Sequence, residues 1–251
     1  MGKTSTEIIY GASPVIESLR AGRRACHEVL ISLGRKESLA SKVAELAKDR
    51  GAPVRYVAKE EIAKAADTPK HQGVAARVDP YPYVELEELV RSAVADPRKA
   101  FLLVLDGITD PHNLGSLMRT AHLMGVHGIV MPRDNQALVT PVAVKSSAGA
   151  SEYLPTARVT NLARTLGYLK EEGIWIAGLA APGEKTIYDN NFKGLNIAIV
   201  LGSEGKGLRR LIKEACDFLL FIPMEGEILS YNVSVAGALA MAEVVRQRRS
   251  S

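Results

Sequence analysis

A series of short apolar segments, which begins at residue 101, constrains the fold of this chain most. Six such segments with few polar residues alternate for the most part with helical patterns, at 101–107, 127–132, 155–159, 174–180, 196–202 and 218–224. Strands that are apolar on both sides are typical of a parallel sheet whose two faces are both covered by helices. The sequence therefore predicts an α/β fold with such a sheet for residues 98–251.

The first 78 residues predict a second, smaller α/β unit. Four apolar strand patterns alternate there with amphipathic helical patterns, and Gly51 follows the end of one helix pattern, as glycine often does. In residues 79–97, Pro80 and Pro82 interrupt regular structure before a short acidic helix pattern. We therefore expect a small domain over 1–78, a linker over 79–97 and a larger domain over 98–251.

Charge is distributed unevenly along the chain. Residues 1–78 hold 14 Lys and Arg against 9 Asp and Glu, a net charge of +5, whereas residues 79–97 carry −4. A basic first segment favours a polyanionic partner, although an ordinary solvated surface can have the same composition. Aromatic residues make up 5% of the chain, which argues against a stacking platform for single-stranded nucleic acid.

Features that the sequence lacks argue against a membrane segment and a metal site. It contains no run of 18 apolar residues and no apolar signal-peptide core, so we expect no membrane segment. Cys26 and Cys216 lie far apart and lack the spacing of metal ligands, so we expect no metal. A reducing, cytoplasmic environment is the simplest interpretation.

Unusual loops follow three of the expected strands, at the edge where parallel sheets bind ligands. The loop after 101–107 contains Asn113, which could cap the next helix or contact a ligand, and Arg119 follows six positions later. At 100° per residue, these two side chains leave the helix in different directions.

The second loop, GSEGKG at 202–207, lets the backbone approach a ligand closely. It matches neither the G-x-G-x-x-G dinucleotide fingerprint nor the phosphate-binding P-loop, so we expect neither NAD nor ATP. Glu204 is either a hydrogen-bond acceptor for a ligand or an ordinary acid at the start of a helix.

The third loop runs from Pro223 towards a last helix over 232–249, which Ser230 or Asn232 could cap. This helix carries the small residues Ser234, Ala236, Gly237, Ala238 and Ala240. We expect Gly237, or a neighbour on its face, to meet another helix at close range.

In their order and spacing, the three loops resemble the three motifs of the SpoU (TrmH) branch of the SPOUT RNA methyltransferases. The first motif matches as Asn113, Gly115 and Arg119. The second and third match at Leu201, Gly202, Glu204, Gly205 and Gly207, and at Ile222, Pro223, Met224, Ser230, Asn232, Val233, Ser234, Val235 and Ala236. The resemblance covers residues 98–250, and the basic first unit resembles the family's ribosomal-protein-like substrate-binding domain.

The resemblance implies a fold and an activity that the strand pattern cannot supply. It implies a SPOUT-type sheet with a carboxy-terminal trefoil knot that builds an S-adenosylmethionine site, and a homodimer in which each site is completed by the neighbouring subunit. The wider match is to members that 2′-O-methylate a guanosine of 23S rRNA. Two alternatives stay open: a tRNA ribose 2′-O-methyltransferase, and a non-catalytic RNA-binding factor of ribosome assembly.

The same resemblance implies the residues of the site. The catalytic set is Asn113, Arg119, Glu204, Ser230 and Asn232, and the cofactor-binding set is Leu201, Gly202, Glu204, Gly207, Ile222, Met224, Ser230 and Tyr231. Tyr231 departs from the family, which commonly has an aliphatic residue there. Because arginine keeps its proton at ordinary pH, we expect Arg119 to grip the RNA phosphate or stabilise the developing alkoxide, and not to act as a base.

Overall fold

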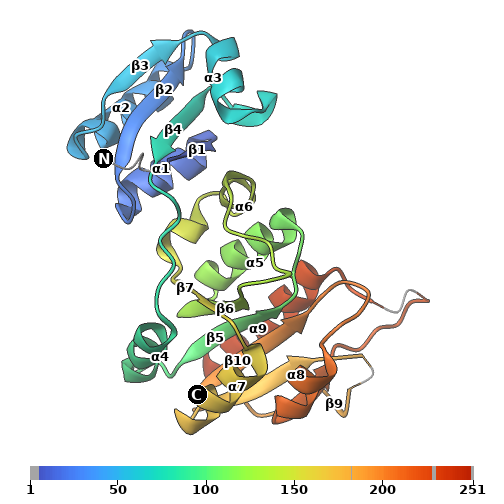
Figure 1. Ribbon diagram of the computed structural model, residues 1–251. Coiled ribbons are helices and arrows are strands. Elements are labelled where there is room, and N and C mark those ends of the chain that lie inside the picture. Colours follow the sequence, from blue (N-terminus) through green and yellow to red (C-terminus); the bar gives the residue numbers. More distant parts are fainter. Residues whose placement is uncertain (1–5, 182, 228–229, 250–251) are drawn as a thin grey trace. The chain divides into compact units, whose positions relative to one another are not determined.

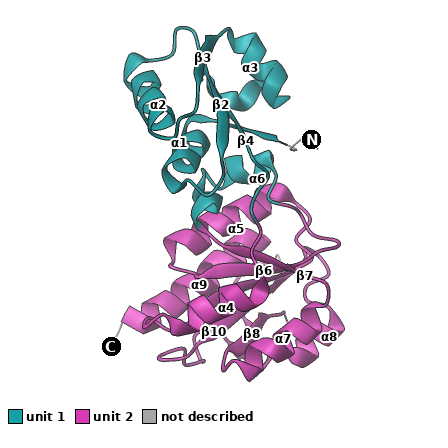
Figure 2. Ribbon diagram, turned by 60° about the vertical axis from the view of Figure 1, so that its left-hand side comes forward, with its two compact units in different colours: residues 1–82, 139–153 teal, residues 83–138, 154–251 magenta. Residues whose placement is uncertain are grey.

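The chain forms two compact units in a computed structural model that describes residues 6–181, 183–227 and 230–249 (Figures 1 and 2). Unit 1 contains the described residues up to Pro82 together with Val139–Tyr153. Unit 2 contains Tyr83–Leu138 and the described residues from Leu154 onward.

Unit 1 is built on a four-stranded mixed sheet. Its strands are β1 (Glu7–Tyr10), β2 (Cys26–Ser32), β3 (Val54–Val57) and β4 (Val74–Val78), in the order β1-β4-β2-β3. β4 runs antiparallel to β1 and β2, and β2 is parallel to β3. The helices of this part of the chain are α1 (Ala12–Ala21), α2 (Glu37–Asp49), α3 (Lys59–Ala66) and the 3₁₀ turn η1 (Pro69–His71).

A buried ion pair ties the segment 139–153 to the rest of unit 1. This segment forms α6 (Pro141–Ser146) and the 3₁₀ turn η2 (Ala150–Tyr153). The side chain of Arg24 is fully buried, and its Nε donates to Glu152 Oε2 at 3.0 Å. Breaking a buried pair leaves an uncompensated charge, so this contact fixes the segment firmly.

Unit 2 is built on a seven-stranded sheet in which every pairing is parallel, so the predicted parallel sheet is confirmed. The strand order is β7-β6-β5-β10-β8-β11-β9. These strands are β5 (Phe101–Asp106), β6 (Gly128–Pro132), β7 (Thr156–Val159), β8 (Trp175–Leu179), β9 (Lys185–Thr186), β10 (Ile197–Gly202) and β11 (Phe218–Phe221).

Helices cover both faces of this sheet, as predicted (Figure 1). They are α4 (Leu86–Ala95), α5 (Pro111–Leu123), α7 (Leu162–Glu171), α8 (Arg210–Ala215) and α9 (Val233–Arg249). Residues of α4, α7 and α8 share a core cluster with Val200 of β10. The next side chain, Leu201, lies beside Gly237 of α9, and α9 packs on α5. Successive strand side chains point to opposite faces, so α5 and α9 cover the other face.

The division into units differs from the expected domain boundaries of 1–78, 79–97 and 98–251 at two places. Leu89, Val90 and Ala93 of α4 are buried in the core of unit 2, because the acidic helix has an apolar face that the sheet covers. The segment 139–153 lies between two strands of unit 2 in sequence, yet it groups with unit 1 through its contacts with α1 and β1.

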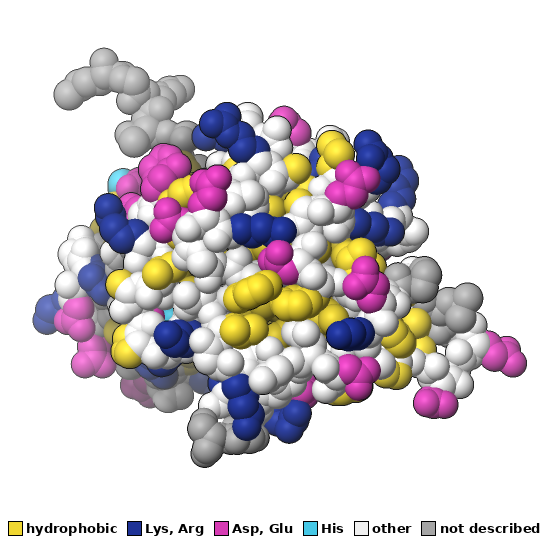
Figure 3. Space-filling model, turned by 90° about the horizontal axis from the view of Figure 1, so that it is seen from below, with side chains coloured by type: hydrophobic (Ala, Val, Ile, Leu, Met, Phe, Trp, Pro, Cys, Tyr) yellow, Lys and Arg dark blue, Asp and Glu magenta, His cyan; other side chains and the backbone are white. Residues whose placement is uncertain are grey.

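The surface shown in Figure 3 carries basic and acidic side chains interspersed around a central apolar patch, so this face has no field of a single sign. Within the described ranges, no helix has the length and apolar character needed to cross a membrane.

Candidate active site

Two of the three loops singled out in the sequence leave neighbouring strands of unit 2 at the same edge of the sheet. β5 and β10 pair in parallel register from Ile197 with Phe101 to Gly202 with Asp106. The loop before α5 and the glycine loop therefore begin side by side, at the carboxyl ends of their strands. Ligands bind at this edge in open parallel sheets.

A hydrogen-bonded network joins all three loops. Asn113 Nδ2 donates to Glu204 Oε1 at 2.8 Å, and Asn232 Nδ2 donates to the same oxygen at 2.8 Å. Asn232 Nδ2 also lies 3.1 Å from Asn113 Oδ1. Three of the expected catalytic residues, one from each loop, are thus held together. A carboxylate that accepts two amide N–H groups has a fixed orientation.

The caps of two helices explain why these asparagines can meet. Asp110, not Asn113, caps α5, because its side chain accepts a hydrogen bond from the His112 backbone N–H at 3.0 Å. Asn113 thus lies within the first turn, and its side chain reaches Glu204 instead of capping. Asn232 caps α9 through Oδ1, which accepts from the Ser234 N–H at 2.9 Å, and Nδ2 remains for the network.

A cavity of about 640 Å³ adjoins the network, and all eight expected cofactor-binding residues line it. These residues are Leu201, Gly202, Glu204, Gly207, Ile222, Met224, Ser230 and Tyr231. Ser230, which was also expected to be catalytic, lies in the wall of this cavity. The Tyr231 hydroxyl donates to the Pro223 carbonyl at 3.3 Å, so the departure from the family pattern links two parts of the third loop.

The shape of the glycine loop depends on Gly202. A Cβ atom there would collide with the backbone of Gly207 and Leu208. The loop folds back so that Ser203 and Gly207 form an isolated bridge, with the Gly207 N–H donating to the Ser203 carbonyl at 2.9 Å. Only a residue without a side chain allows this close backbone approach.

Arg119 is the one expected catalytic residue that lies neither in the network nor in the wall of the 640 Å³ cavity. It is exposed on α5 and lines neither the 640 Å³ cavity nor its neighbour. Among the residues that the structure describes, no hydrogen bond or ion pair holds its guanidinium. Within one chain, its charge is therefore free to bind a ligand.

A second cavity, of about 470 Å³, shares Glu204, Lys206 and Gly207 with the first. Asp106 lines it and is buried, and it accepts from Arg209 Nε at 2.6 Å and from the Arg209 backbone N–H at 2.9 Å. Sequence reasoning missed this pair. The signal was an aspartate at the end of an apolar strand, since a buried carboxylate needs a cation or hydrogen-bond donors.

Metal chemistry was not expected from the sequence. In the described part of the chain, no group of three or more His, Cys, Asp or Glu side chains is placed to hold a metal ion.

Two protein-family models match most of the chain. A family model described as the SpoU rRNA Methylase family matches residues 100–242, and a model described as RNA 2′-O ribose methyltransferase substrate binding matches residues 8–84. This chain belongs to the SpoU rRNA methylase family. The family resemblance expected from the three loops is therefore confirmed.

The relatives of this SpoU-family chain match it over nearly its whole length. The 23S rRNA (guanosine-2′-O-)-methyltransferase RlmB of Escherichia coli K12 is 40% identical over 246 residues, which are 97% of this chain and 99% of the relative. A crystal structure of an RNA 2′-O ribose methyltransferase superimposes with a TM-score of 0.81 and 25% identity, covering 97% of this chain and 89% of that one.

The fold is also that of the SpoU methyltransferase AviRb from Streptomyces viridochromogenes, whose structure was solved with AdoMet. Its TM-score is 0.81 at 23% identity, over 98% of this chain and 92% of that one.

Proposed function

We propose that this SpoU-family methylase transfers a methyl group from S-adenosylmethionine to the ribose 2′-hydroxyl of a guanosine in 23S rRNA. The observation that carries the proposal is the junction of Asn113, Glu204 and Asn232 beside the 640 Å³ cavity. The 40% identity to RlmB over almost the full length supports the substrate class.

The 640 Å³ cavity fits the methyl donor in size and in the chemistry of its lining. Small-molecule sites commonly enclose roughly 300–1,000 Å³. Backbone groups around Gly202 and Ile222 offer donors and acceptors for an adenosine, and Leu201 and Met224 offer apolar contacts. When bound, S-adenosylmethionine supplies an electrophilic methyl group. Tyr231 would contribute to the wall of the same site.

Glu204 lies where the proton of the attacking hydroxyl can be taken up. Both amide N–H groups of the network end on its Oε1. Oε2 has no bonding partner among the described residues, so this oxygen is available to accept a hydrogen bond from the substrate. Asn113 and Asn232 then orient the carboxylate, and water or the RNA phosphate offers a second route for the proton.

Arg119 supplies the positive charge that the reaction needs. Its planar guanidinium can donate two parallel hydrogen bonds to the phosphate of the target nucleotide, or it can stabilise the developing alkoxide. Because it lines neither of the two cavities next to the network, we propose that it acts on the site of a partner subunit in a homodimer.

The finer features of the fold belong to the same proposal. We propose that the carboxy-terminal part of unit 2 forms a trefoil knot around the cofactor site. The return of α9 to pack on α5 and β10 supports this path. The expected cytoplasmic location stays a prediction that agrees with an rRNA substrate.

Substitutions of Asn232 should separate its role as the cap of α9 from its role in the hydrogen-bonded network. Asn232→Ala removes both, and loss of a cap costs about 0.5–2 kcal/mol of unfolding free energy. Asn232→Asp keeps an oxygen for the Ser234 N–H but places a second carboxylate against Glu204. We therefore expect near-normal thermal unfolding for Asn232→Asp with strongly reduced methylation. Equal losses of stability in both variants would contradict this separation.

The proposed function is tested by mapping 2′-O-methyl groups on rRNA from a deletion strain and its complemented partner. We expect one guanosine of 23S rRNA to lose its methyl group in the deletion strain and to regain it on complementation. A methyl group lost from a tRNA instead would identify the tRNA alternative. Absence of S-adenosylmethionine binding by calorimetry would favour the non-catalytic assembly factor.

A further inference from the structure

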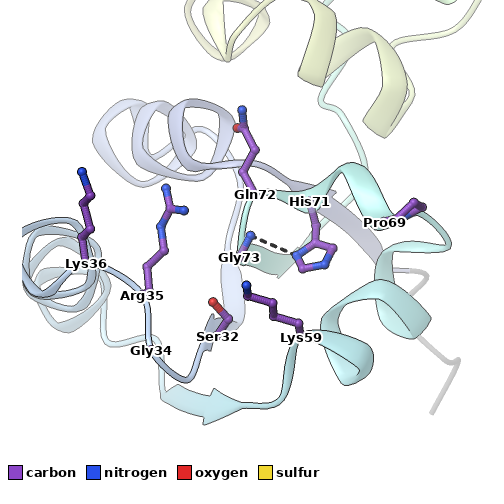
Figure 4. Close-up of a pocket in the computed structure, with 9 residues that line it drawn as sticks. All are labelled: Ser32, Gly34, Arg35, Lys36, Lys59, Pro69, His71, Gln72 and Gly73. Atoms are coloured by element: carbon purple, nitrogen blue, oxygen red, sulfur yellow. Dashed lines mark hydrogen bonds between the residues drawn. The ribbon is translucent and has the colours of Figure 1, made fainter.

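A third cavity, remote in sequence from the methylase motifs, lies in unit 1 and has a volume of about 300 Å³ (Figure 4). Nine residues line it: Ser32, Gly34, Arg35, Lys36, Lys59, Pro69, His71, Gln72 and Gly73. Three of them are cationic at neutral pH, and none is acidic. Its lining therefore favours an anion.

Ser32 is the observation that points to a ligand. It ends β2 and is only 1% exposed, yet its hydroxyl has no hydrogen-bond partner among the described residues. Buried hydroxyl groups are ordinarily paired, and each exception needs a cause. The Nε of Arg35, in the same cavity wall, is also buried without a described partner. Two residues of one basic cavity wall thus each carry a buried donor without a described partner.

A hydrogen bond from Gly73 fixes the tautomer of His71. Ser32 and Arg35 lie next to Gly73, since a Cβ atom there would come within 2.5 Å of Ser32 Oγ and 3.3 Å of Arg35 Cδ (Figure 4). The Gly73 backbone N–H donates to His71 Nδ1 at 3.0 Å. In a neutral ring, this bond places the proton on Nε2 and makes that nitrogen a donor.

The charge state of His71 is consistent with this role. Burial, and then the positive charge of Lys59, lower the pKa of the imidazole below its usual value of 6.5. The ring therefore stays neutral at pH 7 and keeps a single donor.

Helix α2 adds to the anion-binding character of the cavity. Its N-cap residue is Lys36, whose side chain makes no capping hydrogen bond, so the backbone N–H groups of the first turn receive no side-chain acceptor there. Such N–H groups bind phosphate readily. The acidic neighbours Glu37 and Glu60 are not among the lining residues.

We propose that this cavity binds a backbone phosphodiester of the RNA substrate, with Ser32, Arg35 and Lys59 as its principal donors. The inference rests on the proposed function for the identity of the RNA. His71 contributes the only aromatic ring among the lining residues and is buried, so the cavity offers no platform for a base. Contacts of this kind hold the register of a nucleic acid and do not read its sequence.

Substitution of Ser32 tests the site without changing charge. Ser32→Ala removes an unpaired buried hydroxyl, so the melting temperature should equal or exceed that of the wild type. The affinity of the full-length protein for a 23S rRNA fragment that the wild type methylates should nevertheless fall several-fold, as measured by fluorescence anisotropy. Unchanged RNA affinity would overturn the proposal.

A matched pair of charge reversals distinguishes RNA binding in this cavity from a general electrostatic attraction of RNA to the protein. Lys59→Glu and Lys42→Glu change the net charge equally, but Lys42 is an exposed residue of α2 that does not line the cavity. We expect Lys59→Glu to weaken binding about tenfold more than Lys42→Glu. Lys59→Glu should also reduce the salt dependence of binding: the negative slope of log affinity against log salt should become shallower by about one, as it does on loss of a phosphate contact. Equal effects of the two variants would overturn the assignment.

Inorganic phosphate distinguishes failure of this site from failure of the proposed function. In the full-length wild type, we expect phosphate to shift the ring NMR signals of His71 saturably, and Ser32→Ala to lose that shift. If this holds but no rRNA is methylated, the proposed function fails and the anion site stands. If phosphate binds while Ser32→Ala and Lys59→Glu leave RNA affinity unchanged, the cavity accepts free phosphate only and the RNA assignment is wrong.

Discussion

Replacement of Arg119 by alanine is expected to nearly abolish methylation, by at least about 10²-fold, which is the usual loss when one charge-stabilising donor is removed. Affinity for S-adenosylmethionine should stay close to that of the wild type, because Arg119 does not line the 640 Å³ cavity. The fold should also be unaffected, since no described residue bonds its guanidinium. Steady-state methylation of the rRNA fragment and calorimetry with the cofactor measure these outcomes.

The conservative variant distinguishes a planar fork from a simple positive charge. Arg119→Lys keeps the charge but cannot donate two parallel hydrogen bonds, so it should also be nearly inactive. Arg164 is an exposed arginine of α7, on the other face of the sheet, and Arg164→Ala serves as the matched control with normal turnover. Near-normal activity of Arg119→Lys would rule out the fork.

A mixing experiment tests whether Arg119 acts on the partner subunit. Arg119→Ala and Asn232→Asp should each be inactive alone. If Arg119 completes the neighbouring site, a mixed dimer contains one site with both native residues, and partial activity returns. Failure to recover any activity in dimers shown to have exchanged subunits would place Arg119 at the site of its own chain.

The parallel sheet and the junction of the loops were predictable because both follow from local patterns. Apolar runs reveal strands that are covered on both faces, and parallel strands bring their carboxyl ends to one edge. The loops at that edge contain Asn113 and Glu204, and the spacing of the third motif predicted that Asn232 belongs to the same site. Tyr231 lines the 640 Å³ cavity, and its bond to Pro223 depends on how the third loop folds.

Ion pairs between residues far apart in the chain could not be predicted from the sequence. Arg24 and Glu152 lie 128 positions apart, and no local pattern indicates that they share a buried site. The same holds for Asp106 and Arg209, which are 103 positions apart. Because of the first pair, the position of the segment 139–153 could not be predicted from its neighbours in the chain.

The stripe of small residues on α9 was predicted in part. A close helix contact at Gly237 is confirmed, since a Cβ atom there would lie 2.5 Å from Leu117 Cδ2 of α5. Gly237 is buried within its own chain. Small side chains indicate close packing but not which helix approaches. Val235, by contrast, lies on the solvent side of α9 and is 46% exposed.

Substitution of Gly237 by leucine is expected to weaken folding and cofactor binding together. The new side chain would meet Leu117 and Leu201, which are both buried, and a Cβ atom would already lie 2.7 Å from Leu201 Cδ1. Overpacking of this kind costs about 1–3 kcal/mol or more of unfolding free energy. Leu201 also lines the 640 Å³ cavity, and α9 begins directly after Asn232, so displacement of the helix distorts the site.

Chemical denaturation and calorimetry with S-adenosylmethionine measure the two effects on the same preparation. Val235→Leu is the control, since it places the same side chain on the exposed side of α9 and should change neither quantity. Gly237 does not line the cavity, so a loss of affinity would have to be transmitted through Leu201 or the start of α9. If Gly237→Leu unfolds more easily yet binds the cofactor as the wild type does, α9 packs the core without supporting the site, and the proposed coupling is wrong.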